Sequence, residues 1–163
     1  MSLERIFFKT IFTVFILINS TMSISFAKES CSFIKNSDHR YMCEARSGNS
    51  SSKCGLIKDS DLRNFCIAIV KKESSRCGLI KKSDMRNSCS SEVSDNSGRC
   101  GLIKNADDRN LCFAKSEKKE SKCGLINDSD LRNYCYGVVT HNGSKCGLIK
   151  DSDARNRCYS ESI

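Results

Sequence analysis

The chain is short of the residues that usually build cores and active sites. Its 163 residues include no tryptophan and no proline, and aromatic residues make up only 7%. There are two histidines, His39 and His141, and no C-x2-C pair, so no metal site is expected. A nucleophile with a base at a recognisable spacing and a glycine-rich phosphate loop are also missing. These absences predict no catalytic, cofactor or metal site, and a protein that is not an enzyme.

The first 27 residues differ from the rest and are typical of a secretory signal. Arg5 and Lys9 form a basic start, residues 11–18 form a short apolar run, and residues 25–27 (Ser-Phe-Ala) offer a peptidase site. A membrane anchor is the less favoured alternative, because this apolar run is too short to span a bilayer comfortably. The sequence therefore predicts cleavage after Ala27, no membrane span in the mature chain, and a secreted or periplasmic protein.

The net charge is mildly basic. It is +8 for the whole chain, and loss of the signal leaves +7. Such a charge favours weak attraction to acidic partners. Basic and aromatic residues do not alternate as they do in nucleic-acid binders, so nucleic acid is not expected. A protein or an anionic surface of glycan or lipid is the partner that this charge predicts.

Cysteine is the residue in excess. The 12 cysteines follow one another at alternating steps of 12 and 11 residues. The period is therefore 23 residues, and residues 28–163 form an array of six repeats. In an exported chain, paired cysteines form disulfides. The repeats begin at Cys31, Cys54, Cys77, Cys100, Cys123 and Cys146.

Two disulfide patterns fit the spacing. The 12-residue steps close within a repeat, and the 11-residue steps close between repeats but leave Cys31 and Cys158 unpaired. An unpaired thiol is a liability in an exported protein, so the first pattern is favoured. Each such bridge closes a short loop and contributes about 3 kcal/mol by restricting the unfolded chain. The expected pairs are Cys31–Cys43, Cys54–Cys66, Cys77–Cys89, Cys100–Cys112, Cys123–Cys135 and Cys146–Cys158.

Three further positions never vary when each repeat is numbered from its first cysteine as 0. Position 3 is Ile, position 7 is Asp and position 9 is Arg. We expect ion pairs between neighbouring repeats, such as Arg63 with Asp84, and a row of arginines that binds anions is the alternative. These residues are Asp38, Arg40, Asp61, Arg63, Asp84, Arg86, Asp107, Arg109, Asp130, Arg132, Asp153 and Arg155.

The pattern between these positions predicts short helices. Ser60 is expected to cap a helix over residues 61–72, and a second copy is expected over residues 130–140. A shorter helical element around the first cysteine completes a helix–turn–helix unit. No repeat shows the sustained alternation of a strand. The predicted fold is an all-α array of six disulfide-stapled units, curved or extended, whose divergent first repeat is an end repeat.

Two functions follow from this array. The favoured one is a secreted, non-enzymatic binding protein that presents a periodic, mildly basic surface and gains avidity from repetition. Its specificity would depend on variable positions expected to face outward, namely Phe65, Ser88, Leu111, Tyr134 and Arg157. The alternative is a precursor of cationic, disulfide-bonded peptides. Cleavage would follow the basic residue before each repeat from the second to the sixth: Lys53, Arg76, Arg99, Lys122 and Lys145.

Overall fold

The computed structural model describes residues 29–163, so the expected secretory signal at residues 1–27 lies outside the described part. That part is built from helices, and no strand occurs in it. The long helices are α2 (Ser37–Ser47), α4 (Ser60–Lys71), α6 (Ser83–Ser94), α7 (Ala106–Glu117), α8 (Ser129–Val139) and α10 (Ser152–Glu161). The short ones between them are α3 (Ser51–Cys54), α5 (Ser74–Cys77), η1 (Ser97–Leu102), η2 (Glu120–Leu125) and α9 (Gly143–Cys146). The all-α prediction is confirmed.

The long helices begin where the sequence indicated, but with a different cap. The side chain of Asp59, not of Ser60, accepts the backbone N–H of Leu62 at 2.8 Å. Ser60 already has helical geometry and belongs to the first turn, so its hydroxyl is not in the capping position. Asp128 caps α8 in the same way, through the N–H of Leu131. Both helices therefore start one residue earlier than expected.

Five of the six long helices, all except α10, end in the same kind of turn. The residue at position 18 has a positive φ in five repeats, for example 57° at Lys72 and 52° at Lys118. The chain then reverses into the short helix that carries the next cysteine. The spacers between the cysteine pairs differ in sequence, but each one forms the end of a long helix, a turn and a short helix. Because their length is constant, each repeat is placed on the next one in the same way.

All six disulfides close within a repeat, which confirms the predicted pairing. Cys54 and Cys66, for example, have Cα atoms 5.5 Å apart and join the end of α3 to the middle of α4. No free cysteine is present in residues 29–163. The isoleucine at position 3 lies beside each disulfide and is 1% exposed in every repeat. A disulfide and one isoleucine thus form most of the small core of each unit.

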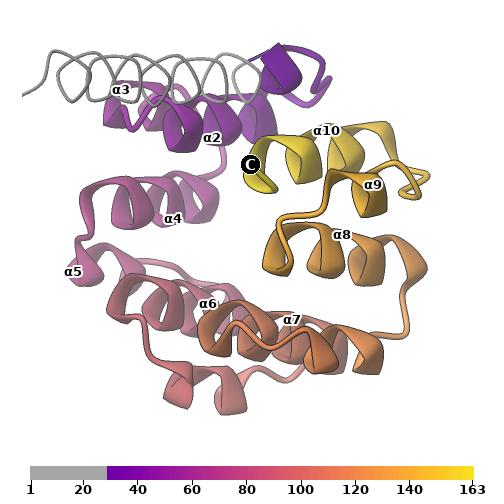
Figure 1. The fold of residues 1–163 in the computed structure, drawn as a ribbon. Helices are drawn as coiled ribbons and strands as arrows, with labels where there is room; N and C mark the ends of the chain where they lie inside the picture. The colour runs from indigo at the N-terminus through magenta and orange to yellow at the C-terminus, as the bar shows by residue number, and fades with distance from the viewer. Residues whose placement is uncertain (1–28) are drawn as a thin grey trace, which may run out of the picture.

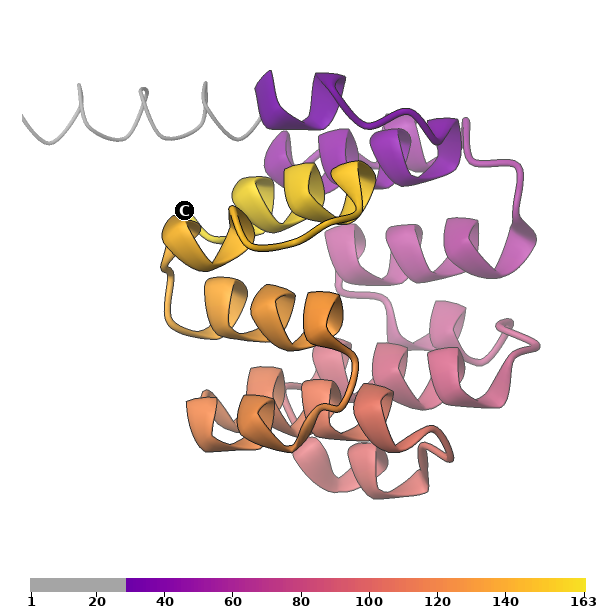
Figure 2. The same cartoon turned by 90° about the vertical axis from the view of Figure 1, so that its right-hand side faces the viewer.

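The array closes into a ring. Figure 1 shows α2, α4 and α6 along one side and α7, α8 and α10 along the other, with α10 returning to lie beside α2. The view in Figure 2 shows the same closure, and the contacts between helices include α10 with α2. The first and last repeats are therefore neighbours. The predicted array of six stapled units is confirmed, and its curvature is strong enough to close it. The first repeat was expected to diverge as an end repeat with one neighbour, but it has a neighbour on each side.

Candidate functional site

The invariant aspartates join consecutive repeats through backbone hydrogen bonds. Asp61 accepts the N–H groups of Lys81 and Lys82 in the next repeat, each at 3.0 Å. The same contact closes the ring, since Asp153 accepts the N–H groups of Lys35 and Asn36 at 2.9 Å each. These N–H donors lower the pKa of all six carboxyl groups from the usual value of aspartate.

The invariant arginines also have a structural role, but within their own repeat. The Nη1 of Arg63 donates to the carbonyl oxygen of Ile57 at 2.9 Å. The equivalent bond occurs in every repeat, at 2.7 to 2.9 Å. Among residues 29–163, no ion pair within 4 Å joins one of these arginines to one of the aspartates. The expected ion pair of Arg63 with Asp84 is therefore wrong. Arg63 donates to a backbone carbonyl of its own repeat, and Asp84 accepts a backbone N–H of the next repeat.

Position 14 carries a signal that the sequence reasoning missed. It is always a small residue: Ala45, Ala68, Ser91, Ala114, Gly137 and Ser160. This residue packs on the disulfide of the next repeat, and a Cβ placed on Gly137 would lie 2.6 Å from Cys158 Sγ. Ser160 makes the same contact across the closure, with its Oγ 3.0 Å from Cys43 Sγ.

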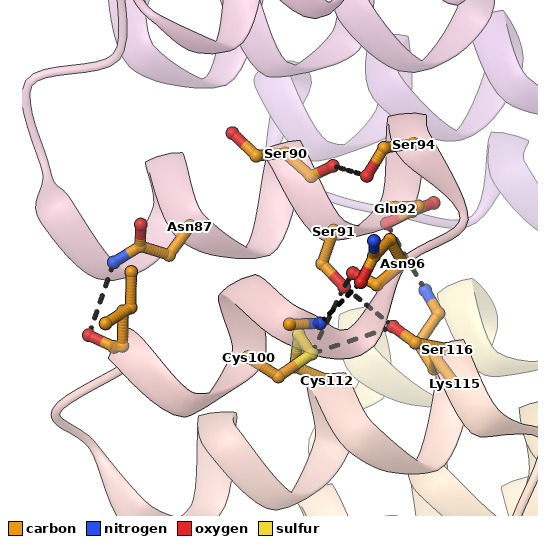
Figure 3. Close-up of a disulfide and its surroundings, with 12 residues drawn as sticks. Asn87, Ser90, Ser91, Glu92, Ser94, Asn96, Cys100, Cys112, Lys115 and Ser116 are labelled. Carbon is orange, nitrogen blue, oxygen red and sulfur yellow. Dashed lines mark hydrogen bonds and ion pairs between the residues drawn. A yellow bond between two sulfur atoms is a disulfide. The ribbon is translucent and has the colours of Figure 1, made fainter.

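One of these small residues is a serine with a complete set of polar contacts. The Ser91 hydroxyl donates to the carbonyl oxygen of Asn96 at 2.8 Å, and its Oγ lies 2.8 Å from Ser116 Oγ. It also lies 3.2 Å from Cys100 Sγ. Figure 3 shows this cluster around the Cys100–Cys112 disulfide. The hydroxyl is accommodated in a fully buried site because each polar atom finds a partner.

A cavity of about 420 Å³ lies at the centre of the ring and is lined by all six long helices. The variable residues at position 11 line it, so the prediction that they face outward is wrong. They lie on the same helical face as positions 8 and 15, which also contribute lining residues such as Leu62 and Lys115. The position-11 residues that line the cavity are Met42, Phe65, Ser88, Leu111, Tyr134 and Arg157.

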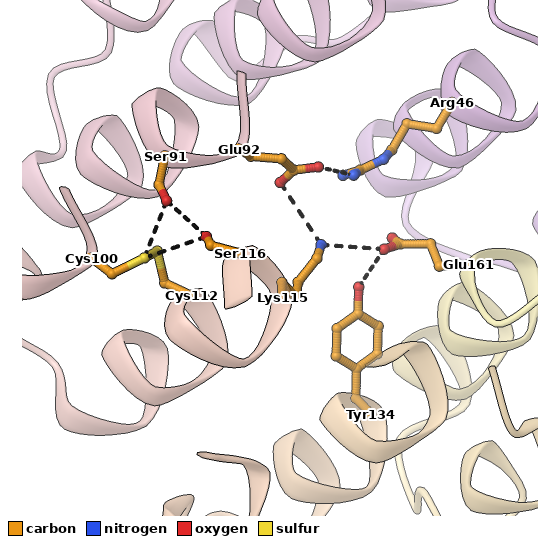
Figure 4. A network of polar contacts seen from close by, with 9 residues as sticks. All are labelled: Arg46, Ser91, Glu92, Cys100, Cys112, Lys115, Ser116, Tyr134 and Glu161. Carbon is orange, nitrogen blue, oxygen red and sulfur yellow. Dashed lines mark hydrogen bonds and ion pairs between the residues drawn. A yellow bond between two sulfur atoms is a disulfide. The ribbon is translucent and has the colours of Figure 1, made fainter. Parts of the chain in front are cut away.

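A cluster of charged side chains forms one part of the cavity wall (Figure 4). Arg46 pairs with Glu92, and Lys115 Nζ lies 3.8 Å from Glu92 and 3.6 Å from Glu161. The hydroxyl of Tyr134 donates to Glu161 at 2.8 Å. The cluster joins α2, α6, α7, α8 and α10 across the cavity, so it links the first repeat to the third, fourth, fifth and sixth.

The pKa values in this cluster favour its charged state. Burial opposes ionisation of Glu161, but Arg46 and Lys115 outweigh it and lower the pKa of the carboxyl group to about 2. Burial raises the pKa of Tyr134 to about 12, so the phenol stays protonated as a donor. The two glutamates raise the pKa of Arg46 and Lys115 despite burial. Near neutral pH, Glu161 is therefore ionised, Arg46 and Lys115 are protonated, and Tyr134 is a neutral hydrogen-bond donor.

The outer surface of the ring carries a second periodic feature. The residue at position 2 is a large apolar side chain in every repeat, and these side chains are 52% to 62% exposed. Two residues later, position 4 is an exposed lysine in five repeats. We call this set the apolar–basic belt: Phe33, Leu56, Leu79, Leu102, Leu125 and Leu148, with Lys35, Lys58, Lys81, Lys104 and Lys150.

No protein-family model matches the chain, and neither curated proteins nor solved structures provide a match to it. Its sites must therefore be interpreted from their own chemistry.

Among residues 29–163, no group of three or more His, Cys, Asp or Glu side chains is arranged to hold a metal ion. Within the same residues, no helix has the length and apolar character needed to cross a membrane.

Proposed function

We propose that the protein is an exported, non-enzymatic binding protein that docks on anionic lipid surfaces through the apolar–basic belt. The observation that carries this proposal is the repetition of an exposed apolar residue and a lysine in nearly every unit of a closed ring. The belt repeats the same pair of side chains around the ring. A flat surface therefore meets neighbouring members of the belt at the same time, whichever side of the ring approaches it.

Export is supported by two observations. The basic and apolar segment before residue 28 is typical of a secretory signal. The six buried disulfides also require an oxidising compartment to form and persist.

The chemistry of the belt fits a lipid surface better than a purely polar partner. A lysine near an anionic membrane contributes about 1 kcal/mol. Three aspartates at position 5 (Asp59, Asp128 and Asp151) reduce the net charge of the belt, so charge alone gives weak binding. The exposed leucines supply the remaining binding free energy, because an apolar side chain that enters the headgroup boundary is removed from water. The weak contacts of the belt members that face the lipid then act together on one rigid ring.

The test is vesicle co-sedimentation of the mature, oxidised protein. We expect binding to vesicles of phosphatidylcholine and phosphatidylglycerol in equal parts, and little binding to phosphatidylcholine alone. The variant with Leu56, Leu79 and Leu125 all changed to Ser should bind about a hundredfold more weakly, if each half-exposed leucine buries about 1 kcal/mol of apolar surface. A matched control changes Lys71, Lys118 and Lys119, which lie outside the belt, to Gln.

Several results would contradict docking on lipid. They are a failure of the wild-type protein to sediment with either vesicle, equal sedimentation of the leucine variant, or an equal loss in the lysine control. Binding to heparin that survives the leucine changes would identify an acidic glycan as the partner instead.

The peptide-precursor alternative has less support. Each proposed cleavage site is followed by a cysteine that is at most 1% exposed, and the bond lies inside a short helix. A protease would have to open the unit before cutting it. Fragments beginning at Cys54 and Cys77 in the native extracellular fluid would nevertheless favour the precursor, whereas a single full-length species favours the ring.

A further inference from the structure

The central cavity is a second site, separate from the belt. Its volume of about 420 Å³ lies in the range of small-molecule pockets, which is roughly 300 to 1,000 Å³. Much of its wall is apolar and comes from opposite sides of the ring. Phe65 and Leu62 lie on α4, Met85 lies on α6, and Leu111 and Leu131 lie on α7 and α8. An apolar molecule that enters would leave water on several sides at once.

The charged cluster is balanced within itself, with two cations and two carboxylates. Glu92 pairs with both Arg46 and Lys115, and Glu161 pairs with Lys115. Arg157 also lines the cavity, but no ion pair within 4 Å in residues 29–163 includes it.

The contacts of Arg157 leave its guanidinium incompletely paired. Its carbon lies 5.2 Å from the centre of the Tyr134 ring, and its buried Nε has no hydrogen-bond partner. A guanidinium stacked on an aromatic ring keeps N–H donors in its own plane for a carboxylate or another anion.

Three further carboxylates border the cavity but do not serve Arg157. Asp84 accepts the backbone N–H of Asn105 at 3.0 Å as part of the contact between repeats. Asp95 is exposed to solvent, and Asp108 lies at the rim of the cavity with its side chain only partly withdrawn from water. This partial desolvation, with the neighbouring Asp84 and Asp107, raises the pKa of Asp108. These acids disfavour an anion beside them, and Arg46 and Lys115 are already paired, so Arg157 is the cation of this wall that remains to receive an anionic group.

We propose that the cavity binds one small, mainly apolar molecule with a single anionic group, whose charge pairs with Arg157 while its apolar part contacts Phe65, Leu111 and Leu131. The site is distinct from the belt and does not depend on lipid docking.

The test uses 8-anilinonaphthalene-1-sulfonate as a fluorescent anionic probe, which decanoate or the neutral decanol then displaces. We expect one tight probe site per chain, and decanoate should compete at least tenfold better than decanol, as a charge-assisted hydrogen bond predicts. Arg157→Met, which places in the sixth repeat the residue that the first repeat has as Met42, should remove this preference and leave decanol unchanged. Lys71→Met removes the same charge from the outer surface and should change neither competitor.

Two further variants separate this site from the belt and from loss of folding. Ser88→Phe, the residue of the second repeat at this position, should fill the cavity and weaken both competitors. The belt variant with serine at Leu56, Leu79 and Leu125 should keep the decanoate preference of the wild type.

Four outcomes would overturn the proposal. They are the absence of a tight probe site, equal competition by decanoate and decanol in the wild type, an unchanged preference in Arg157→Met, and a preference lost in the belt variant. Far-ultraviolet circular dichroism checks that each variant folds. If Arg157→Met does not fold, the competition of decanoate against decanol in the wild type and the effect of Ser88→Phe still test the proposal.

Discussion

Ring closure gives the sharpest prediction, through the aspartate that joins the last repeat to the first. In Asp153→Ala, the N–H groups of Lys35 and Asn36 lose an acceptor that now lies 2.9 Å from each of them. A hydrogen bond to a charged group is worth about 1.5 to 3 kcal/mol, and solvent screening reduces this value at an exposed position. We therefore expect a loss of about 1 to 3 kcal/mol for the pair.

The assay is guanidinium denaturation of the oxidised protein, followed by circular dichroism, with thermal unfolding as a second measurement. A loss of this size lowers the melting temperature by about 4 to 12 °C in a protein of this length. Asp61→Ala is the matched control, because Asp61 makes the same contact within the array. A closed ring predicts similar shifts for both variants. An open array leaves Asp153 without a partner, so a neutral Asp153→Ala beside a destabilised Asp61→Ala would refute closure.

Three other changes have defined outcomes. The backbone donors lower the pKa of Asp153 in the folded state, so its stabilising contribution is complete above the unfolded pKa of about 3.9 and is lost as pH falls through the folded value. The denaturation midpoint of the wild type should accordingly fall more steeply below pH 4 than that of Asp153→Ala, and parallel curves would contradict this linkage. Gly137→Leu should cost about 1 to 3 kcal/mol or more, because even a Cβ meets Cys146 Sγ at 2.8 Å, whereas Gly137→Ala should cost less, as alanine occupies this position in three other repeats. Chemical denaturation of the two variants compares them, and an equal loss would argue against the close packing. Lys118→Gly should raise stability by about 0.5 kcal/mol because φ is 52° at this position, and a drop in the melting temperature would show that the turn does not hold the lysine in a strained conformation.

The sequence by itself determined the features that depend on residues close together in the chain. The spacing of Cys54 and Cys66 allows a bridge within one helical hairpin, and the polar residues before Leu62 start a helix. Such contacts need no knowledge of other repeats. The small residue at position 14 was also readable, since Ala68 and Gly137 differ from the larger residues around them.

Only the tertiary structure decided closure and the direction of the variable side chains. Whether six units form a ring depends on the rotation between neighbours, which accumulates from repeat to repeat and must add up to a full turn. This rotation depends on the contacts between repeats, such as the packing of position 14 on the next disulfide and the aspartate bonds to the next backbone. A sequence pattern does not report that angle. Position 11 varies from Phe65 to Ser88 to Arg157, and this variability suggested an outer surface, but a ring has two surfaces that contact solvent. These side chains lie on the inner one, where closure of the ring brings the same face of all six long helices together around the cavity.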